Sequence, residues 1–302
     1  MKILISDPIH PDAVAWLQGQ PGAVVSFQPE ISPNELLSVI SEYDALIVRS
    51  RTKVTQEIIA AAKRLRVIGR AGTGLDNIDV EAAQKANILV LNAPGANATA
   101  VAELTLGLMI ALARDLPSAL SAAASGKRVK SYGMELAGKT LGVIGYGRIG
   151  RVVAHLALAF GMRVLAHDIV TPQEIASGVH LVSLEVLLGE SDFVSLHVPL
   201  TPQTRGFVSR ELLGRFKMGS FLINTARAEL VDESAVVGAL ESGRLRGYAA
   251  DLYSERSPLI GHPKALLTPH IGASTEEAQR RAGREIVEKV WGALQASPAS
   301  FA

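Results

Sequence analysis

Short apolar runs alternate with helix-like segments along almost the whole chain, and this alternation constrains the fold more than any other feature. Helix start and stop signals separate the runs, such as the capping box Ser32-Pro33-Asn34-Glu35. A β-α-β rhythm predicts parallel sheets with helices on both faces. We therefore expect an α/β fold with two Rossmann-like, doubly wound parallel-sheet domains and a cleft between them. The expected strands are 3–5, 45–48, 67–69, 88–90, 140–144, 163–167, 193–196, 220–223, 245–250 and 265–267.

The rhythm is interrupted once, near the middle of the chain. We expect a long helix over 97–115, followed by a connector over 117–138 that is rich in serine, alanine and glycine. A final helix is expected over 275–294. The 302 residues suit two domains, since a domain has roughly 150 residues.

Composition excludes several classes of function. The formal net charge is +1 and aromatic residues make up 5% of the chain, which disfavours a nucleic-acid-binding surface. Cysteine is absent, so there are no disulfides or thiolate metal sites, and no metal-ligand spacing appears. The first residues lack a signal-peptide pattern, and the apolar run 104–113 is too short to span a bilayer. We expect a cytoplasmic protein that binds neither nucleic acid nor membrane.

The most specific local motif is Gly145-Tyr146-Gly147-Arg148-Ile149-Gly150, which follows an apolar strand and opens a helix. In that context G-x-G-x-x-G predicts a dinucleotide site, with the pyrophosphate at the helix N-terminus. Asp168 ends the next strand, where a carboxylate can accept hydrogen bonds from the adenosine ribose. Its charge would repel a 2′-phosphate, so we predict NAD rather than NADP. The alternative is a glycine-rich turn that binds nothing.

Seven motifs occur in the order found in one known family, which the chain resembles: the D-isomer-specific 2-hydroxyacid dehydrogenases. The resemblance implies NAD-dependent hydride transfer at C2 of a small anionic D-2-hydroxy acid. It also implies a substrate domain at 1–96 and 276–302, a cofactor domain at 97–275, and a homodimer. The helix near 101–113 is a candidate for the dimer interface or, equally, for the core of one chain. The motifs lie at 48–55, 69–77, 92–97, 145–150, 197–201, 224–227 and 268–275.

The same resemblance implies a catalytic arginine, glutamate and histidine. Arg227 matches the arginine that holds the substrate carboxylate, and His270 matches the acid/base. Without the resemblance, His270 would be read as a capping or core histidine. The glutamate motif departs from the family pattern, because Arg256 occupies the expected position and Glu255 lies one residue earlier. Either Glu255 pairs with His270 and raises its pKa, which we favour, or Glu255 is a solvated loop charge and the carboxylate is missing.

The remaining cofactor contacts also follow from the resemblance. Arg148 and Ile149 belong to the pyrophosphate turn, and His197 is expected to contact a cofactor ribose rather than act as a second acid/base. Asp251 would accept a hydrogen bond from the nicotinamide carboxamide. The other expected contacts are Val198, Pro199, Thr204, Thr225, Ala226 and Gly272.

On the substrate side, the glycine-rich turn Gly72-Thr73-Gly74 could bind a carboxylate through its backbone N–H groups, or could simply be tight. Arg49, Ser50 and Arg51, with Asn97, are expected to hold a distal anion, although only one arginine of an alternating pair can face the site. The alternative for this cluster is a solvated basic edge.

Within the family, the chain most resembles the phosphoglycerate dehydrogenases of serine biosynthesis. Glycerate with hydroxypyruvate, lactate or sulfolactate would suit the same scaffold. The sequence ends at Ala302, soon after the last expected helix, so we expect no serine-binding regulatory domain. The alternative from another class is an NAD-sensing, corepressor-like regulatory protein.

Overall fold

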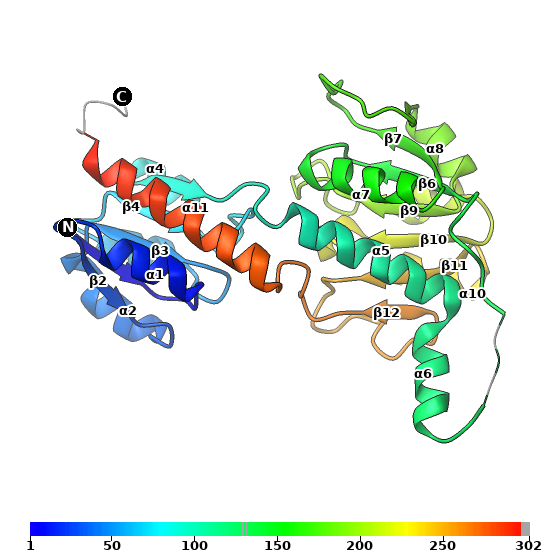
Figure 1. Cartoon of the computed structure of the whole chain (residues 1–302), viewed down its shortest axis with the longest axis horizontal. Helices are drawn as coiled ribbons and strands as arrows, with labels where there is room; N and C mark the ends of the chain where they lie inside the picture. Colours follow the sequence, from blue (N-terminus) through cyan, green and yellow to red (C-terminus); the bar gives the residue numbers. More distant parts are fainter. Residues whose placement is uncertain (129, 131, 297–302) are drawn as a thin grey trace. The chain divides into compact units, whose positions relative to one another are not determined.

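The computed structural model describes residues 1–128, 130 and 132–296, and these residues form two compact units (Figure 1). Unit 1 comprises residues 1–97 and the residues from 273 onwards, and unit 2 comprises residues 98–272. Residues 297–302, which end our expected substrate domain, lie outside the described part.

Unit 1 is built on a five-stranded sheet in the order β2-β1-β3-β4-β5, in which every pairing is parallel. Its strands are β1 (Lys2–Ile5), β2 (Val24–Phe27), β3 (Ala45–Val48), β4 (Val67–Arg70) and β5 (Leu89–Asn92). The strand order changes direction between β1 and β3, and ligands of doubly wound sheets bind at such a point, outside the carboxyl ends of the strands.

Helices cover both faces of this sheet, because alternate strand residues point to opposite sides. On one face, Ile3 and Ile5 pack with α1 (Pro11–Gln18) and α11 (Glu276–Gln295). On the other, Leu4 packs with α2 (Pro33–Val39), α3 (Gln56–Ala61) and α4 (Val80–Lys85). The return of α11 to this unit explains why its chain is discontinuous.

Unit 2 has a seven-stranded parallel sheet in the order β12-β11-β10-β9-β6-β7-β8. Here the order changes direction between β6 and β9. The strands are β6 (Thr140–Ile144), β7 (Arg163–His167), β8 (Val179–Leu181), β9 (Phe193–Leu196), β10 (Ser220–Asn224), β11 (Leu245–Ala250) and β12 (Ala265–Leu267).

One face of this sheet is covered by α5 (Ala98–Arg114) and α7 (Arg148–Ala159), and the other by α8 (Leu184–Glu190), α9 (Arg210–Gly214) and α10 (Glu233–Glu241). The expected fold class of two doubly wound parallel-sheet units is thereby confirmed.

Three local predictions differ from the structure. The expected connector begins with the helix α6 (Leu116–Ala124), so that prediction was wrong for this stretch. Alanine is the strongest helix former, and Pro117 lies in the first turn, where proline is tolerated. The strands β2 and β8 were also missed. The four residues of β2 do not show a buried pattern, since Val24 and Phe27 are exposed, and β8 has only three residues, of which only Val179 is buried.

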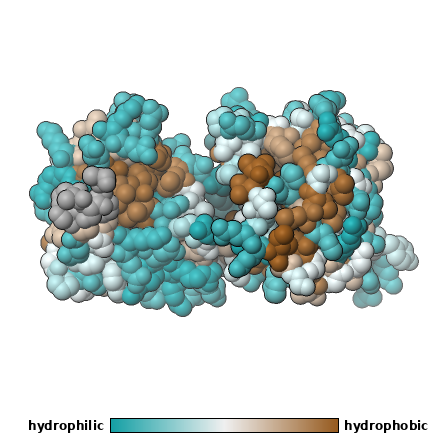
Figure 2. All heavy atoms as spheres, turned by 90° about the horizontal axis from the view of Figure 1, so that it is seen from above, coloured by the Kyte–Doolittle hydropathy of each residue, from teal (hydrophilic) through white to brown (hydrophobic). Residues whose placement is uncertain are grey.

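Apolar side chains gather in patches on the faces of both units seen in Figure 2, among residues of hydrophilic and intermediate character. None of the helices that the structure describes is both long and apolar enough to cross a membrane.

Candidate active site

The glycine motif forms the turn between β6 and α7. Gly145 has φ +94°, and a Cβ there would lie 2.7 Å from the His197 carbonyl. A Cβ at Gly150 would lie 2.1 Å from the Gly145 carbonyl oxygen. The packing of the chain against itself therefore requires both glycines. They lie where the strand order changes direction, between β6 and β9.

Gly147 is different, because nothing in the chain requires a glycine there. It is the N-cap of α7 with φ −81°, and no described heavy atom lies within 4 Å of the position a Cβ would take. The open space lies at the helix N-terminus, where the N–H groups of the first turn, including those of Arg148 and Ile149, lack helical partners. A pyrophosphate that approaches the backbone here would explain the glycine. The residues present thus fit a dinucleotide.

Asp168 follows β7 and lies against the glycine turn. Its carboxylate accepts hydrogen bonds from the backbone N–H of Tyr146 at 2.8 Å and of Val170 at 3.0 Å. These two bonds orient the carboxylate and leave lone pairs free for ribose hydroxyls. No lysine or arginine occurs in 169–178, so this loop brings no positive charge for a 2′-phosphate.

His197 follows β9, and its Nε2 lies 2.8 Å from the Ser195 hydroxyl. Burial lowers the pKa of His197 to about 3, so the ring is neutral at physiological pH. The following turn is closed by Thr204, whose hydroxyl donates to the Pro199 carbonyl at 2.7 Å. Val198 packs against the core of unit 2 beside this turn.

The loop after β10 carries Arg227, and the buried side chain of Asn224 holds it in place. The Asn224 amide oxygen accepts from Ala226 N–H at 3.1 Å, and its Nδ2 donates to the Arg227 carbonyl at 2.8 Å. Thr225 joins the loop to α5, with its hydroxyl 3.0 Å from that of Thr105. The Arg227 guanidinium is partly buried, and its Nη1 donates to the Ala226 carbonyl at 2.7 Å.

Asp251, which follows β11, organises the loop that carries His270. Its buried carboxylate accepts from Thr268 Oγ1 at 2.7 Å, Ile271 N at 2.8 Å and Gly272 N at 2.7 Å. Its backbone carbonyl accepts from His270 N at 2.8 Å. These bonds hold His270 in the left-handed region, with φ +57°, and its side chain is exposed.

Three protein donors thus occupy the Asp251 carboxylate, which leaves about one lone-pair position for a nicotinamide carboxamide. The expected contact between Asp251 and the carboxamide stays a prediction.

Glu255 lies in an exposed turn after β11, and it takes part in no hydrogen bond or ion pair with any residue that the structure describes. The preceding residue is fixed, because Glu233 accepts from Ser254 N–H at 3.1 Å and from the Ser254 hydroxyl at 2.5 Å. The pairing of Glu255 with His270 stays a prediction.

The expected substrate residues of unit 1 follow β3 and β4. Arg49 is half-buried and Ser50 is exposed, whereas the guanidinium of Arg51 donates to backbone carbonyls of the unit. In the next turn, Thr73 donates to the Asn97 side chain at 2.9 Å. Gly72 is buried and Gly74 is partly buried, so both backbones belong to the same compact turn.

Three polar residues beside the expected site residues of their own unit were not identified from the sequence: Asp7 and Arg70 in unit 1, and Asn224 in unit 2. Arg70 donates through Nε to the Arg49 carbonyl at 3.2 Å, and its guanidinium lies where a Cβ of Gly72 would be. All three are polar residues at the end of an apolar strand or just after it, and that position is the signal that could have found them.

Comparison with known proteins shows the family to which the chain belongs. A family model described as the NAD binding domain of D-isomer specific 2-hydroxyacid dehydrogenases matches residues 106–272. The chain is 46% identical to D-3-phosphoglycerate dehydrogenase of Methanocaldococcus jannaschii, over 96% of this chain and 57% of that protein. It is 44% identical to hydroxypyruvate reductase of Thermotoga maritima, over 96% of this chain and 97% of that protein.

Among solved structures, NAD⁺-bound 3-phosphoglycerate dehydrogenase of Entamoeba histolytica aligns with a TM-score of 0.82 at 32% identity. The alignment covers 96% of this chain and 94% of that one. The chain therefore spans little more than half of the Methanocaldococcus protein and almost all of the other two.

Proposed function

Because the chain belongs to the D-isomer specific 2-hydroxyacid dehydrogenase family, we propose that it oxidises or forms a D-2-hydroxy acid at C2 with NAD as the hydride carrier. Its NAD-binding domain is the one that the family model matches.

The order of side chains along one sheet edge carries this proposal. The carboxyl ends of β6, β7 and β9 precede the glycine turn, Asp168 and His197, which suit a dinucleotide. The carboxyl ends of the neighbouring strands β10, β11 and β12 precede Arg227, Glu255 and His270. On this proposal, a single edge would present a nucleotide site and, beside it, a guanidinium and an imidazole.

In the proposed reaction, NAD when bound supplies the hydride acceptor. Arg227 binds the substrate carboxylate and polarises the C2 oxygen through its planar donor fork. His270 takes the hydroxyl proton as C2 gives up its hydride, and the carbonyl bond forms from the O–H electron pair. In reduction, His270 returns the proton. Asn224 and Asp251 act on these two groups only by holding their loops.

As substrate we propose 3-phosphoglycerate, which would be oxidised to 3-phosphohydroxypyruvate for serine biosynthesis. Arg49 supports a distal anion, since its half-buried guanidinium is free of hydrogen bonds to the described residues. The names of the relatives support two substrates, because one is a phosphoglycerate dehydrogenase and another a hydroxypyruvate reductase. Glycerate is therefore the second candidate.

The test is NAD-dependent turnover of 3-phosphoglycerate, D-glycerate, D-lactate and sulfolactate, with the L-isomers of glycerate and lactate as controls. We expect turnover of 3-phosphoglycerate, and a loss of at least a hundredfold in kcat in His270→Ala, as general acid-base groups contribute on the order of 10² or more. His262→Ala, in the same part of the chain, is the matched control and should keep wild-type kcat.

Inert 3-phosphoglycerate beside an active D-acid would overturn the substrate and leave the chemistry intact. Equal kcat in wild type and His270→Ala would overturn the proposed acid/base. An NAD-bound protein that turns over none of these acids would favour the regulatory alternative.

A further inference from the structure

A buried carboxylate lies where the sheet of unit 1 changes direction. Asp7 follows β1, its side chain is 0% exposed, and the neighbouring strand β3 leads directly into Arg49. Asp7 and Arg49 therefore meet at the position where doubly wound sheets bind ligands. A buried carboxylate is costly unless it is fully hydrogen-bonded, so its partners indicate its task.

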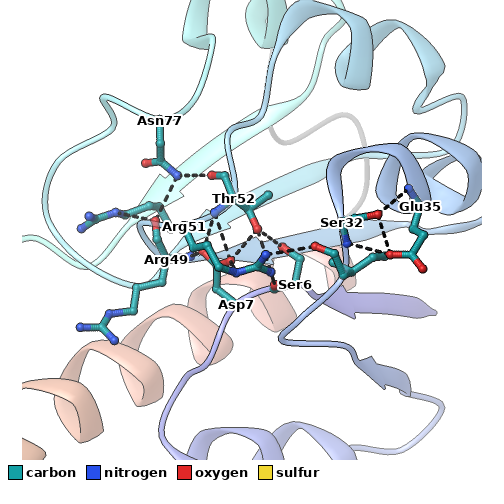
Figure 3. Close-up of polar contacts among 10 residues, drawn as sticks. Ser6, Asp7, Ser32, Glu35, Arg49, Arg51, Thr52 and Asn77 are labelled. Atoms are coloured by element: carbon teal, nitrogen blue, oxygen red, sulfur yellow. Dashed lines mark hydrogen bonds and ion pairs between the residues drawn. The ribbon is translucent and has the colours of Figure 1, made fainter.

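The partners of Asp7 are the two ends of one short loop (Figure 3). Asp7 accepts from the backbone N–H of Arg49 at 2.6 Å and from Thr52 N–H at 3.1 Å, and it also accepts from the Thr52 hydroxyl at 2.5 Å. From the other side, Asn77 Nδ2 donates to the carbonyls of Arg49 at 3.1 Å and Thr52 at 2.7 Å. The loop 49–52 is thus fixed at both ends.

The two arginines of this loop have different environments. The guanidinium of Arg51 forms an ion pair with Asp7 at 3.4 Å and donates to the carbonyls of Ser6 and Ile31. With Lys53, Arg51 lines a hollow of about 470 Å³ between α2 and α3. Its donors are used to hold the chain together, so it has little left for a ligand.

The Arg49 side chain points away from this cluster (Figure 3). Its guanidinium takes part in none of the hydrogen bonds among the residues that the structure describes. Partial burial lowers the pKa of Arg49 while the charge of Asp7 opposes that shift. A guanidinium stays protonated under these conditions, so a half-buried cation with free donors is left for an anion.

We propose that Asp7 is a positioning residue that gives the two arginines different roles. Arg51 anchors the loop, and Arg49 is presented to the anionic end of the substrate. This inference rests on the proposed function, because it assumes that Arg49 binds the acid. The Arg51 guanidinium also compensates the negative charge of Asp7, so that Asp7 does not cancel the attraction of Arg49 for an anion.

The test compares Asp7→Asn with Arg49→Ala and with Asp44→Asn. Asp44 is a matched control: it accepts from Lys2 N–H at 2.7 Å and pairs with Arg64 at 2.9 Å, but it precedes β3 and lies at the opposite edge of the same sheet. KM for the D-acid and for NAD, kcat, and the thermal midpoint are measured for each variant, with the acid identified by the turnover panel.

We expect Asp7→Asn and Arg49→Ala to raise KM for the acid about tenfold, with little change in kcat or in KM for NAD. Asp44→Asn should lower the thermal midpoint and leave KM for the acid unchanged. If Arg49→Ala raises KM for the acid and Asp7→Asn does not, the positioning role is wrong. If Arg49→Ala also leaves KM unchanged, the proposed substrate site has failed instead.

Should Asp7→Asn not fold, Thr52→Val replaces it, since valine keeps the shape of the side chain and removes one donor to Asp7. The expected rise in KM for the acid is then about threefold. An unchanged KM in Thr52→Val, beside a raised KM in Arg49→Ala, would also overturn the role.

Discussion

At the scale of single residues, His197 shows how burial decides which histidine can exchange protons in the working pH range. Its pKa is lowered to about 3 by burial, and its Nε2 lies 2.8 Å from Ser195 Oγ. A ring that stays neutral from pH 5 upwards suits a neutral contact to a cofactor ribose. The exposed His270 is left as the acid/base candidate.

The same shift predicts a dependence of stability on pH. Between the unfolded pKa of 6.5 and the folded pKa of about 3, the unfolded chain binds a proton at His197 that the folded chain does not. This contribution is therefore complete above pH 6.5 and is lost as the pH falls. From pH 7 to pH 5, wild type should lose roughly 2 kcal/mol more unfolding free energy than His197→Asn.

Urea unfolding at the two pH values measures this difference. His180→Asn is the control, since His180 is an exposed histidine on β8, and it should follow wild type. Equal losses in wild type and His197→Asn would contradict the prediction.

The residues that the sequence indicated best are those that a local backbone rule requires. Gly145 and Gly150 follow from the strand-turn-helix context, and Ser32 forms the expected capping box with Glu35 (Figure 3). Asp7, Asn224 and Asp251 are different, because their partners come from loops that meet only in the folded sheet. No spacing along the chain reveals that Asp251 would bind the backbone of 271–272.

At the scale of elements, α7 has Gly147 as its N-cap and Gly150 in its first turn, and the two glycines should respond differently to substitution. Gly150→Ala places a Cβ 2.1 Å from the Gly145 carbonyl oxygen, which forces the turn apart. Gly147→Ala meets nothing within 4 Å and keeps an ordinary φ of −81°. The chain alone therefore tolerates alanine at Gly147, and only a bound pyrophosphate would be displaced.

We expect Gly147→Ala to keep the unfolding free energy of the free protein within about 0.5 kcal/mol and to weaken NADH binding about tenfold or more. Gly150→Ala should lose about 1–3 kcal/mol of unfolding free energy. NADH fluorescence titration and urea unfolding separate the two effects. Wild-type NADH affinity in Gly147→Ala would show that the pyrophosphate does not approach this residue.

Most elements could be predicted because burial leaves a clear pattern in the sequence. The strand β3 and the strand β6 are buried at every position and were expected with the bounds that the structure has. The helix α6 has no buried residue, so no apolar periodicity marked it, and its serines and alanines resembled a linker. The strand β2 likewise has no fully buried residue, and the chain pattern did not reveal it.

At the scale of the whole molecule, the exposed helix α6 is relevant to the predicted homodimer. The helix near 101–113, our candidate interface, belongs to α5, and many of its apolar residues, such as Leu106 and Met109, are buried within the chain. The next helix, α6, exposes Leu116 at 37% and Leu120 at 68%. A nine-residue helix is marginal in water without packing, so a partner that covers it would stabilise it.

We therefore expect the protein to elute as a dimer, with a mass by light scattering of twice 31.9 kDa. Leu120→Glu should shift the protein towards the monomer, because burying an unpaired charge at an apolar contact is costly. Leu37→Glu is the matched control: Leu37 is a leucine on α2 that is 42% exposed, and its substitution should leave the dimer intact. A monomeric wild type would contradict the homodimer itself. A Leu120→Glu variant that stays dimeric at the same concentration would show instead that the two copies meet through another surface, and that α6 has a different partner.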